Sequence, residues 1–363
     1  MKHKRPFIFA LTVLVAMTAI ATIVFSPDAN LRRRVNRLTF PGSDNYDSTL
    51  TKDENTVRRA AAFHLLGPRA VGVLISEFQQ QDSYFEKVRQ KILPNGPDWL
   101  NPQMFGMGTV VKRIMAGDAI ALLGDGAAPA IPALIAGLSH SDINTRATAA
   151  RSLAILGTTN AQAIAALESL TNSSQRRLSL LVGIALWRAQ PDNPNLIRFV
   201  NSCLATNDWL GIQDAREIFA HVNREAAQPF VSGFRMGISN YAPPSVMAKY
   251  ILELEAAKAI WRINGSADVA LLALSTLTNA AALQTLPNDV NPDEAICDLV
   301  HELGEIPSFC DAVKPILVSM PTANNRSRKQ ECIDALQIVN RTLRVDRATD
   351  PSTSGHPRPA FMN

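Results

Sequence analysis

Residues 125–157 decide the fold, and their sequence is DGAAPAIPALIAGLSHSDINTRATAARSLAILG. The first part predicts a helix, because its apolar residues recur at spacings of three and four and so form one stripe. These residues are Ile131, Leu134, Ile135 and Leu138. Pro132 falls in the first turn, where its missing N–H has no helical partner. The polar run 139–142 then ends this helix.

A second helix follows directly. Asp142 or Ser141 can cap it, because a short side-chain oxygen accepts from the free N–H groups of the first turn. Its apolar face carries Ala149, Ala150, Leu153 and Leu156. Gly157 ends it, since glycine adopts the left-handed closing conformation without a Cβ penalty. A helix pair of this size cannot bury its own apolar faces, so it needs similar neighbours on both sides.

The pattern of the second helix's end recurs along the chain, as an apolar residue followed by Gly, Asn or Gln. The ends are Leu66–Gly67, Leu123–Gly124, Leu156–Gly157, Ala189–Gln190, Val222–Asn223, Ile263–Asn264, Leu303–Gly304 and Val339–Asn340. Successive separations are 57, 33, 33, 33, 41, 40 and 36 residues. Spacings of this size are typical of helical repeats.

Two matched columns support this register. The column four residues before the closing polar residue is apolar throughout: Phe63, Ile120, Leu153, Leu186, Phe219, Ile260, Val300 and Leu336. The column seven before it is mostly small: Ala60, Gly117, Ala150, Gly183, Arg216, Ala257, Cys297 and Ile333. Small residues are expected where two helices approach closely, so the second column predicts helix–helix contacts.

The segment 125–157 resembles a HEAT repeat. The matching features are Asp142 and Arg146 at the start of the second helix and Pro132 in the first; Pro229 and Pro315 fall at similar places in their units. The resemblance extends over roughly residues 55–345, and the layout is similar to bacterial membrane-anchored HEAT proteins. It implies an α-solenoid used for protein contacts, with no general activity attached.

The predicted fold is therefore all-α: an α-α superhelix of about eight helix pairs, preceded by one N-terminal transmembrane or signal-anchor helix. Residues 1–25 form the basic head and this helix, and residues 26–52 a polar tether. Residues 53–345 form the solenoid, with an insert at about 82–104. Residues 346–363 are polar and rich in Pro, Ser and Gly, which predicts a disordered tail.

Residues 7–25 contain no charge and would span about 28 Å as a helix, close to the thickness of a hydrocarbon core. This predicts an uncleaved anchor in the inner membrane of a single-pass protein. The alternative is export after signal-peptide cleavage, because Ala19-Ile20-Ala21 fits the small-x-small rule. Basic residues lie on both sides of the run, so the side of the soluble domain stays open.

Charge argues against a nucleic-acid partner. The chain has 36 basic and 32 acidic residues, but seven of the basic and one of the acidic ones flank the apolar run. The remaining 29 basic and 31 acidic residues leave no positive excess to meet phosphates. The four cysteines, Cys203, Cys297, Cys310 and Cys332, form no CxxC pair and predict buried thiols, with one disulfide as the alternative.

Tryptophans supply the candidate contact residues. Trp99 lies in the turn-rich insert, and loops often carry binding contacts; the alternative, which we favour, is that it caps the end of the solenoid. Trp187–Arg188 and Trp261–Arg262 occupy matching positions, so we predict packing residues whose arginine stems lie along the next unit.

We find no catalytic, cofactor or metal motif. His301–Glu302 starts a HExxH pattern, but Glu305 stands where the second histidine would be. Glu253 and Glu255 fall on different faces of one helix and make no carboxylate pair. The predicted function is a membrane-tethered protein-binding scaffold without enzymatic activity. The alternatives are a HEAT-like enzyme, of the bilin-lyase type or with another small-molecule role, and a self-associating structural component of the envelope.

Overall fold

The structure is a computed structural model of the 363-residue chain. It describes residues 27–39, 52–81, 109–206, 208–240, 246–282, 292–319 and 326–349. Within these ranges the chain is helical with short turns and contains no strand, so the all-α prediction is confirmed there.

The chain divides into two compact units, residues 1–46 with 59–133 and residues 47–58 with 134–363. The elements that begin before residue 134 are α2 (Pro27–Thr39), α3 (Lys52–Leu66), α4 (Pro68–Phe78), α6 (Thr109–Ala121), η5 (Gly124–Ala130) and α7 (Ile131–Leu138). Those after it are α8 (Ile143–Leu156), α9 (Ala161–Glu168), α10 (Arg176–Ala189), α11 (Pro194–Thr206), α12 (Trp209–Phe219), α13 (Arg224–Ala227), η6 (Gln228–Phe230), α14 (Val231–Asn240), α15 (Val246–Asn264), α16 (Asp268–Ala282), α17 (Pro292–Leu303), α18 (Pro307–Ser319) and α19 (Arg326–Thr349).

The first unit is centred on the α4–α6 pair, and α2 and η5 pack against both helices. Its core includes Phe63 and Leu74, which are fully buried. Arg113 of α6 is buried as well, and its Nη1 donates to the Gln80 carbonyl just after α4 at 2.9 Å. This arginine therefore satisfies a carbonyl that the end of α4 leaves without a helical partner.

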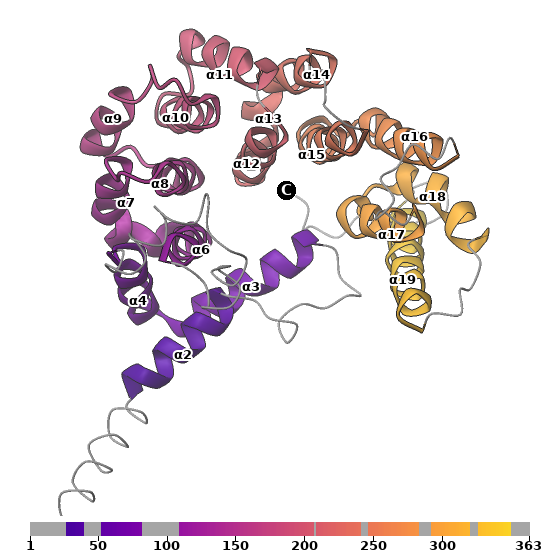
Figure 1. Ribbon diagram of the computed structural model, residues 1–363, viewed down its shortest axis with the longest axis horizontal. Helices are drawn as coiled ribbons and strands as arrows, with labels where there is room; N and C mark the ends of the chain where they lie inside the picture. Colours follow the sequence, from indigo (N-terminus) through magenta and orange to yellow (C-terminus); the bar gives the residue numbers. More distant parts are fainter. Residues whose placement is uncertain are drawn as a thin grey trace, which may run out of the picture. The chain divides into compact units, whose positions relative to one another are not determined.

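The second unit is built in two layers of helices (Figure 1). The inner layer contains α8, α10, α12, α15 and α17, and each of these helices contacts the next. The outer layer contains α9, α11, α14, α16 and α18, and each packs against an inner helix. This arrangement is the stack of helix pairs that the repeated pattern predicts. In this stack each pair buries its apolar faces against its neighbours, which one pair alone cannot do.

The caps expected for 125–157 are present. The Asp142 side chain accepts from the Thr145 N–H at 2.8 Å and so caps α8. Gly157 adopts the left-handed conformation with φ 61° and ends α8. Helix α7 starts only at Ile131, because residues 124–130 form the 3-10 helix η5.

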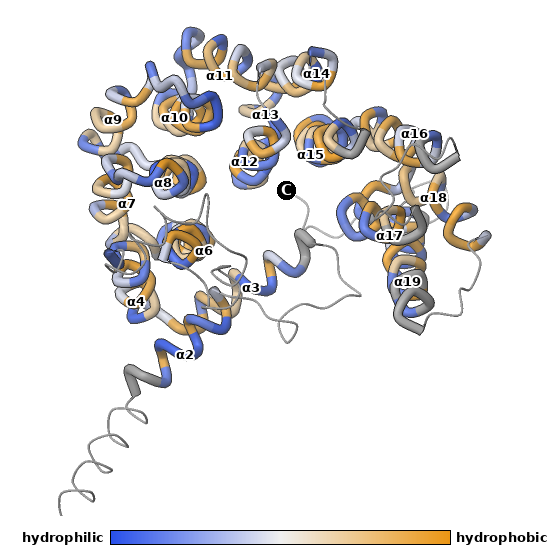
Figure 2. Tube along the Cα trace, in the orientation of Figure 1, coloured by the Kyte–Doolittle hydropathy of each residue, from blue (hydrophilic) through white to orange (hydrophobic). Residues whose placement is uncertain are grey.

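The apolar column of the repeat is the core. Its first seven members are buried, from Phe63 to Val300. Figure 2 shows hydrophobic and hydrophilic residues alternating along the helices of the second unit, as expected of helices with one buried face. The column fails at the last repeat, where Leu336 is only partly buried and Ile333 is 38% exposed. There α19 does not end at Val339 but continues to Thr349, so the last predicted helix end is wrong.

Two predicted segment assignments also need correction. The segment 26–52, predicted as a tether, contains α2, which is anchored against α4 and α6 by the buried Val35 and Thr39. The segment 346–363, predicted as a disordered tail, begins inside a helix, because residues 346–349 belong to α19. The rest of that tail and the insert at 82–104 lie outside the described residues.

The predicted membrane location is corrected as well. Across the described ranges, none of the helices combines the length and the apolar character that a membrane crossing requires. Helix α15 shows why: its 19 residues include Lys249, Glu253, Glu255, Lys258 and Arg262. This finding overturns the assignment to the inner membrane as a single-pass protein. Residues 7–25, on which that assignment was based, lie outside the described residues.

The end of α8 gives a first testable prediction. A Cβ on Gly157 would lie 2.8 Å from Arg188 Nη2, and the residue has a positive φ. We therefore expect Gly157→Ala to lower the free energy of unfolding by about 1–2 kcal/mol, measured by chemical denaturation. Gly72→Ala is the matched control, because a Cβ there meets nothing within 4 Å inside α4. It should raise the free energy of unfolding by about 0.5–1 kcal/mol. Equal effects of the two changes would contradict the role of Gly157 as the C-terminal cap of α8.

Candidate functional site

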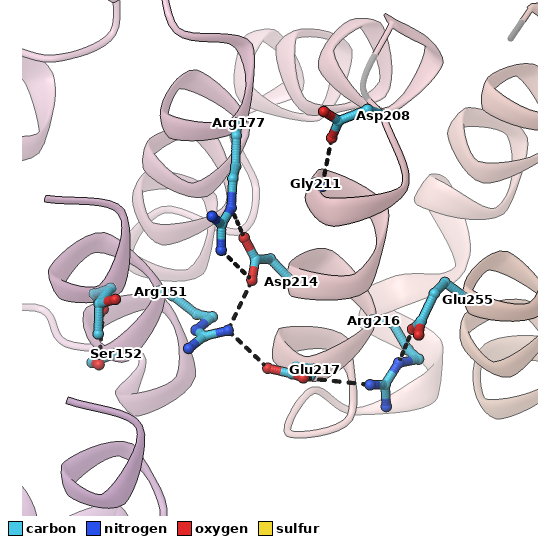
Figure 3. A network of polar contacts seen from close by, with 10 residues as sticks. Arg151, Ser152, Arg177, Asp208, Gly211, Asp214, Arg216, Glu217 and Glu255 are labelled. Carbon is cyan, nitrogen blue, oxygen red and sulfur yellow. Dashed lines mark hydrogen bonds and ion pairs between the residues drawn. The ribbon is translucent and has the colours of Figure 1, made fainter. Parts of the chain in front are cut away.

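The most distinctive feature of the second unit is a chain of ion pairs along its inner helices (Figure 3). Asp214 of α12 lies at its centre, with a side chain only 2% exposed. One oxygen accepts from Arg151 Nη1 of α8 at 2.8 Å, and the other accepts from Arg177 Nε of α10 at 2.5 Å. Asp214 therefore ties three helices together, and it joins residues that lie 63 and 37 positions apart in sequence.

The chain of ion pairs continues through Glu217. Its carboxylate accepts from Arg151 at 3.1 Å and, on the other side, from Arg216 Nη2 at 3.4 Å. Arg216 Nε donates in turn to Glu255 of α15 at 2.6 Å. The signs alternate along the whole series, as Figure 3 shows. We call these six residues the inner-helix network: Arg151, Arg177, Asp214, Arg216, Glu217 and Glu255.

A separate ion pair joins the next two inner helices. Lys258 Nζ of α15 donates to Glu302 Oε2 of α17 at 2.8 Å. The Lys258 side chain is 6% exposed and that of Glu302 is 19% exposed. Burying two charges is costly, and their attraction offsets this cost only with good geometry. The pair therefore links α15 to α17 without being evidence of added stability.

Only part of the inner layer is open to a partner. Residues 178–187 of α10 and 252–260 of α15 are buried without interruption. In the inner-helix network, Arg177 and Glu217 are the most accessible members, with side chains 32% and 33% exposed. Gln213 lies one turn before Glu217 on α12 and is also partly exposed. These side chains form a surface on which charges of both signs are held in place.

Behind this surface lies an aromatic cluster that joins successive repeats. Trp187 of α10 packs edge-on against Phe230 with ring centroids 4.6 Å apart. Phe219 packs against Phe230 and Phe234 at 5.0 and 5.7 Å. All four side chains are at most 2% exposed. The prediction that Trp187 serves packing is confirmed by these contacts.

Arg188 contacts the preceding repeat, whereas its sequence position predicted a contact along the next repeat. Its guanidinium reaches back to α8, where Nη1 donates to the Ala154 carbonyl at 2.6 Å and also to the Ile155 carbonyl. It thus satisfies carbonyls at the end of the preceding repeat rather than lying along the next one. Gln228 plays the same part for α15, since its Nε2 donates to the Ile263 carbonyl at 2.9 Å.

Trp261 is only partly buried, unlike its counterpart Trp187, and it lines a small cavity of about 90 Å³. The cavity lies at the C-terminal ends of α15 and α17 and contains the Lys258–Glu302 pair. Arg224, Arg262 and Glu305 complete its charged lining. A tryptophan beside arginines is a combination enriched where protein partners bind tightly.

Glu253 and Glu255 point to different partners, as the sequence predicted. Glu255 pairs with Arg216, whereas Glu253 is fully buried and neither of its carboxylate oxygens accepts a hydrogen bond from a described residue. Its ion pair with Lys249 spans 3.7 Å. Burial raises the pKa of the Glu253 carboxyl above its usual value, and the Thr276 side chain and the charge of Lys249 offset this in part.

This raised pKa predicts a pH dependence. The folded state retains a proton that the unfolded state releases above about pH 4.5, so Glu253 makes the free energy of unfolding fall as pH rises from there toward the folded pKa. We expect Glu253→Gln to stabilise the protein by about 1–3 kcal/mol at pH 8, and by less at pH 4. Urea denaturation at both pH values measures this. Glu255→Gln is the control and should destabilise, because it breaks the pair with Arg216; a loss of stability in both variants would contradict the assignment.

The other candidates from the sequence add no chemistry. Trp99 lies outside the described residues, so its role as a contact or a cap stays a prediction. Cys203, Cys297 and Cys310 are not in disulfides, and burial raises the pKa of Cys310 to about 12; the side chain of Cys332 is not described. Among the described residues, no cluster of three or more His, Cys, Asp or Glu side chains is placed to hold a metal ion.

The two layers of helices, and the ion pairs between helices of the inner layer, define the class of protein: an α-helical repeat scaffold. Residues 109–186, from α6 to α10, match the family model for HEAT repeats. This match confirms, for these residues, the HEAT-repeat resemblance that the segment 125–157 predicted. A comparison with curated proteins finds no match.

Sequence analysis missed the inner-helix network. The available signal was Arg216, which stands in a column otherwise occupied mainly by small residues. A long charged residue at a helix–helix contact requires a buried counter-charge. Glu255 could have been suggested on that ground, but the pairing of Arg151 with Asp214 crosses an intervening helix and has no local signature.

Proposed function

We propose that the second unit is a protein-binding scaffold that holds its partner against the inner helices. The proposed contact surface contains Arg177, Gln213 and Glu217, and Trp261, which lines the cavity at the C-terminal ends of α15 and α17, is proposed as a second contact. HEAT repeats commonly serve as protein-interaction modules, which supports a protein as the partner. The role is one of binding, and no catalytic step is assigned to any residue.

One observation carries this proposal: accessible charges of both signs are held in fixed positions by buried partners. Arg177 is fixed by Asp214, and Glu217 is fixed between Arg151 and Arg216. A surface side chain loses about 0.5–1.5 kcal/mol of conformational freedom when a partner immobilises it. Here that cost is largely met during folding, so the surface is pre-organised for a partner with complementary charges.

The test is affinity capture of the tagged full-length chain after crosslinking in cells, followed by mass spectrometry. Trp261→Ala removes the half-buried aromatic residue on the inner layer, and Met236→Ala, on the outer helix α14, is the control, because Met236 is 43% exposed. We expect one dominant partner with the native chain and with Met236→Ala, and its loss with Trp261→Ala. Recovery of the protein alone would favour self-association, and equal recovery with both variants would place the contact elsewhere.

A further inference from the structure

A polar cavity of about 370 Å³ lies at an edge of the second unit, between two neighbouring turns. The turn between α7 and α8 contributes Ser139 and His140, and the turn between α9 and α10 contributes Asn172 and Ser173. Arg146 reaches it from the first turn of α8. The cavity lies outside the inner-helix network and plays no part in the surface described above.

The charge of this cavity is its most informative property. Of the described residues that line it, Arg146 alone carries a full charge at neutral pH, and none is acidic. Asp142 is close in sequence, but its carboxylate is engaged elsewhere: Oδ2 accepts from the N–H and the hydroxyl of Thr145 at 2.8 and 2.7 Å. The lining therefore has a net charge of about +1 with polar neighbours.

Arg146 is held in place without its charge being neutralised. Its Nη1 donates to the carbonyl oxygens of His140 and Ser141 at 2.7 and 3.0 Å. No described residue accepts a hydrogen bond from its Nε or Nη2. Nε and Nη2 are neighbouring donors of one planar group, which matches the two oxygens of a carboxylate.

The rest of the lining supplies donors and shape. His140 Nδ1 accepts from the Asp142 N–H at 3.0 Å, so the proton of the neutral ring is on Nε2, which makes that atom a donor. Ser139 and Asn172 are exposed at the mouth. The buried Leu138 and Leu178 form apolar walls that exclude water from one side. A charge-assisted hydrogen bond gains strength where water is excluded.

We propose that this cavity binds a single carboxylate of a protein partner, the side chain of an aspartate or a glutamate. The inference rests on the proposed scaffold function and adds a second, chemically specific contact to it. One arginine balances one carboxylate, whereas a phosphate group carries about −1.5 to −2 charges and would be left under-compensated. The partner is therefore acidic where it meets this edge of the stack.

The test is fluorescence anisotropy of the full-length protein with a labelled polyglutamate peptide, at low ionic strength. A polyglutamine peptide of equal length is the neutral control. We expect binding of the acidic peptide only, and a loss of at least about tenfold in affinity with Arg146→Gln. Arg198→Gln is the matched control, because Arg198 is an exposed arginine of α11 outside the cavity; it should leave the affinity unchanged.

A second variant keeps the result independent of folding. Ser139→Asp places a carboxylate at the mouth without removing a hydrogen bond, because the Ser139 hydroxyl makes none to a described residue. It should weaken binding of the acidic peptide as much as Arg146→Gln does. Acetate and inorganic phosphate are then compared, at equal concentration, as competitors of the acidic peptide. Phosphate should displace the peptide no better than acetate does.

Three results would overturn the proposal: equal binding of the two peptides, equal effects of Arg146→Gln and Arg198→Gln, or stronger competition by phosphate than by acetate. Each of these leaves the scaffold function standing if Trp261→Ala still abolishes capture of the cellular partner. Conversely, loss of the scaffold function would show as no captured partner, whatever the peptide does. The two failures are therefore distinguishable.

Discussion

Replacing Asp214 by asparagine is expected to lower the free energy of unfolding of the second unit by about 3–5 kcal/mol. Asp214 is 2% exposed and accepts hydrogen bonds from both Arg151 and Arg177. Without its charge, the Arg151 side chain, 10% exposed, loses its shortest ion pair, and its contact with Glu217 is longer. A buried charge that loses its partner costs several kcal/mol, because no water replaces the lost interaction.

Urea denaturation followed by circular dichroism measures this loss. Arg235→Gln is the control, because it removes an ion pair with Asp268 in which both side chains are nearly half exposed, at 45% and 48%. Exposed pairs contribute about 0–1 kcal/mol, so the control should change little. Similar effects of the two variants would mean that Asp214 does not hold the three inner helices together.

Phe230→Ala is expected to lower the free energy of unfolding by a similar amount, about 3–5 kcal/mol. Phe230 is fully buried and contacts Trp187 and Phe219, so it connects α10, α12 and η6. Its removal takes away the apolar area and also leaves a cavity, because rings from three separate elements cannot collapse freely into the space. The edge-on contact with Trp187 adds to the loss.

The same denaturation experiment tests this prediction. Leu272→Ala, on the outer helix α16, is the control, because Leu272 is 43% exposed and its truncation leaves no buried cavity. The control should stay within about 0.5 kcal/mol of the native protein. A loss below about 1.5 kcal/mol for Phe230→Ala would mean that the cluster repacks and does not fix the contact between repeats.

The fold could be predicted from sequence where its signals are local. Asp142 and Gly157 mark the two ends of α8 by side-chain capping and by a left-handed residue, which are properties of single positions. The repeat spacing then predicts the stack, because each pair needs a neighbour to bury its apolar face. The repeat pattern did not predict the end of α19, because this helix continues past Val339 and packs against α17 and α18.

The candidate site could not be predicted in the same way. Its ion pairs join residues up to 66 positions apart, and the pairing depends on which inner helices face each other. Arg151 of α8 contacts Asp214 of α12, and these two helices are not consecutive in the inner layer. No rule of sequence spacing therefore predicts this pair. The direction of Arg188 was mistaken for a related reason: its position predicts a contact between repeats but not which repeat it reaches.

The most direct test of the scaffold is photo-crosslinking from single positions of the full-length chain in cells. A photoreactive amino acid at Gln213, on the inner helix α12, is compared with one at Leu272, on the outer helix α16. The proposed surface predicts one dominant protein adduct from position 213 and none from position 272. The same adduct from position 272, or adducts from neither position, would contradict binding at the inner helices.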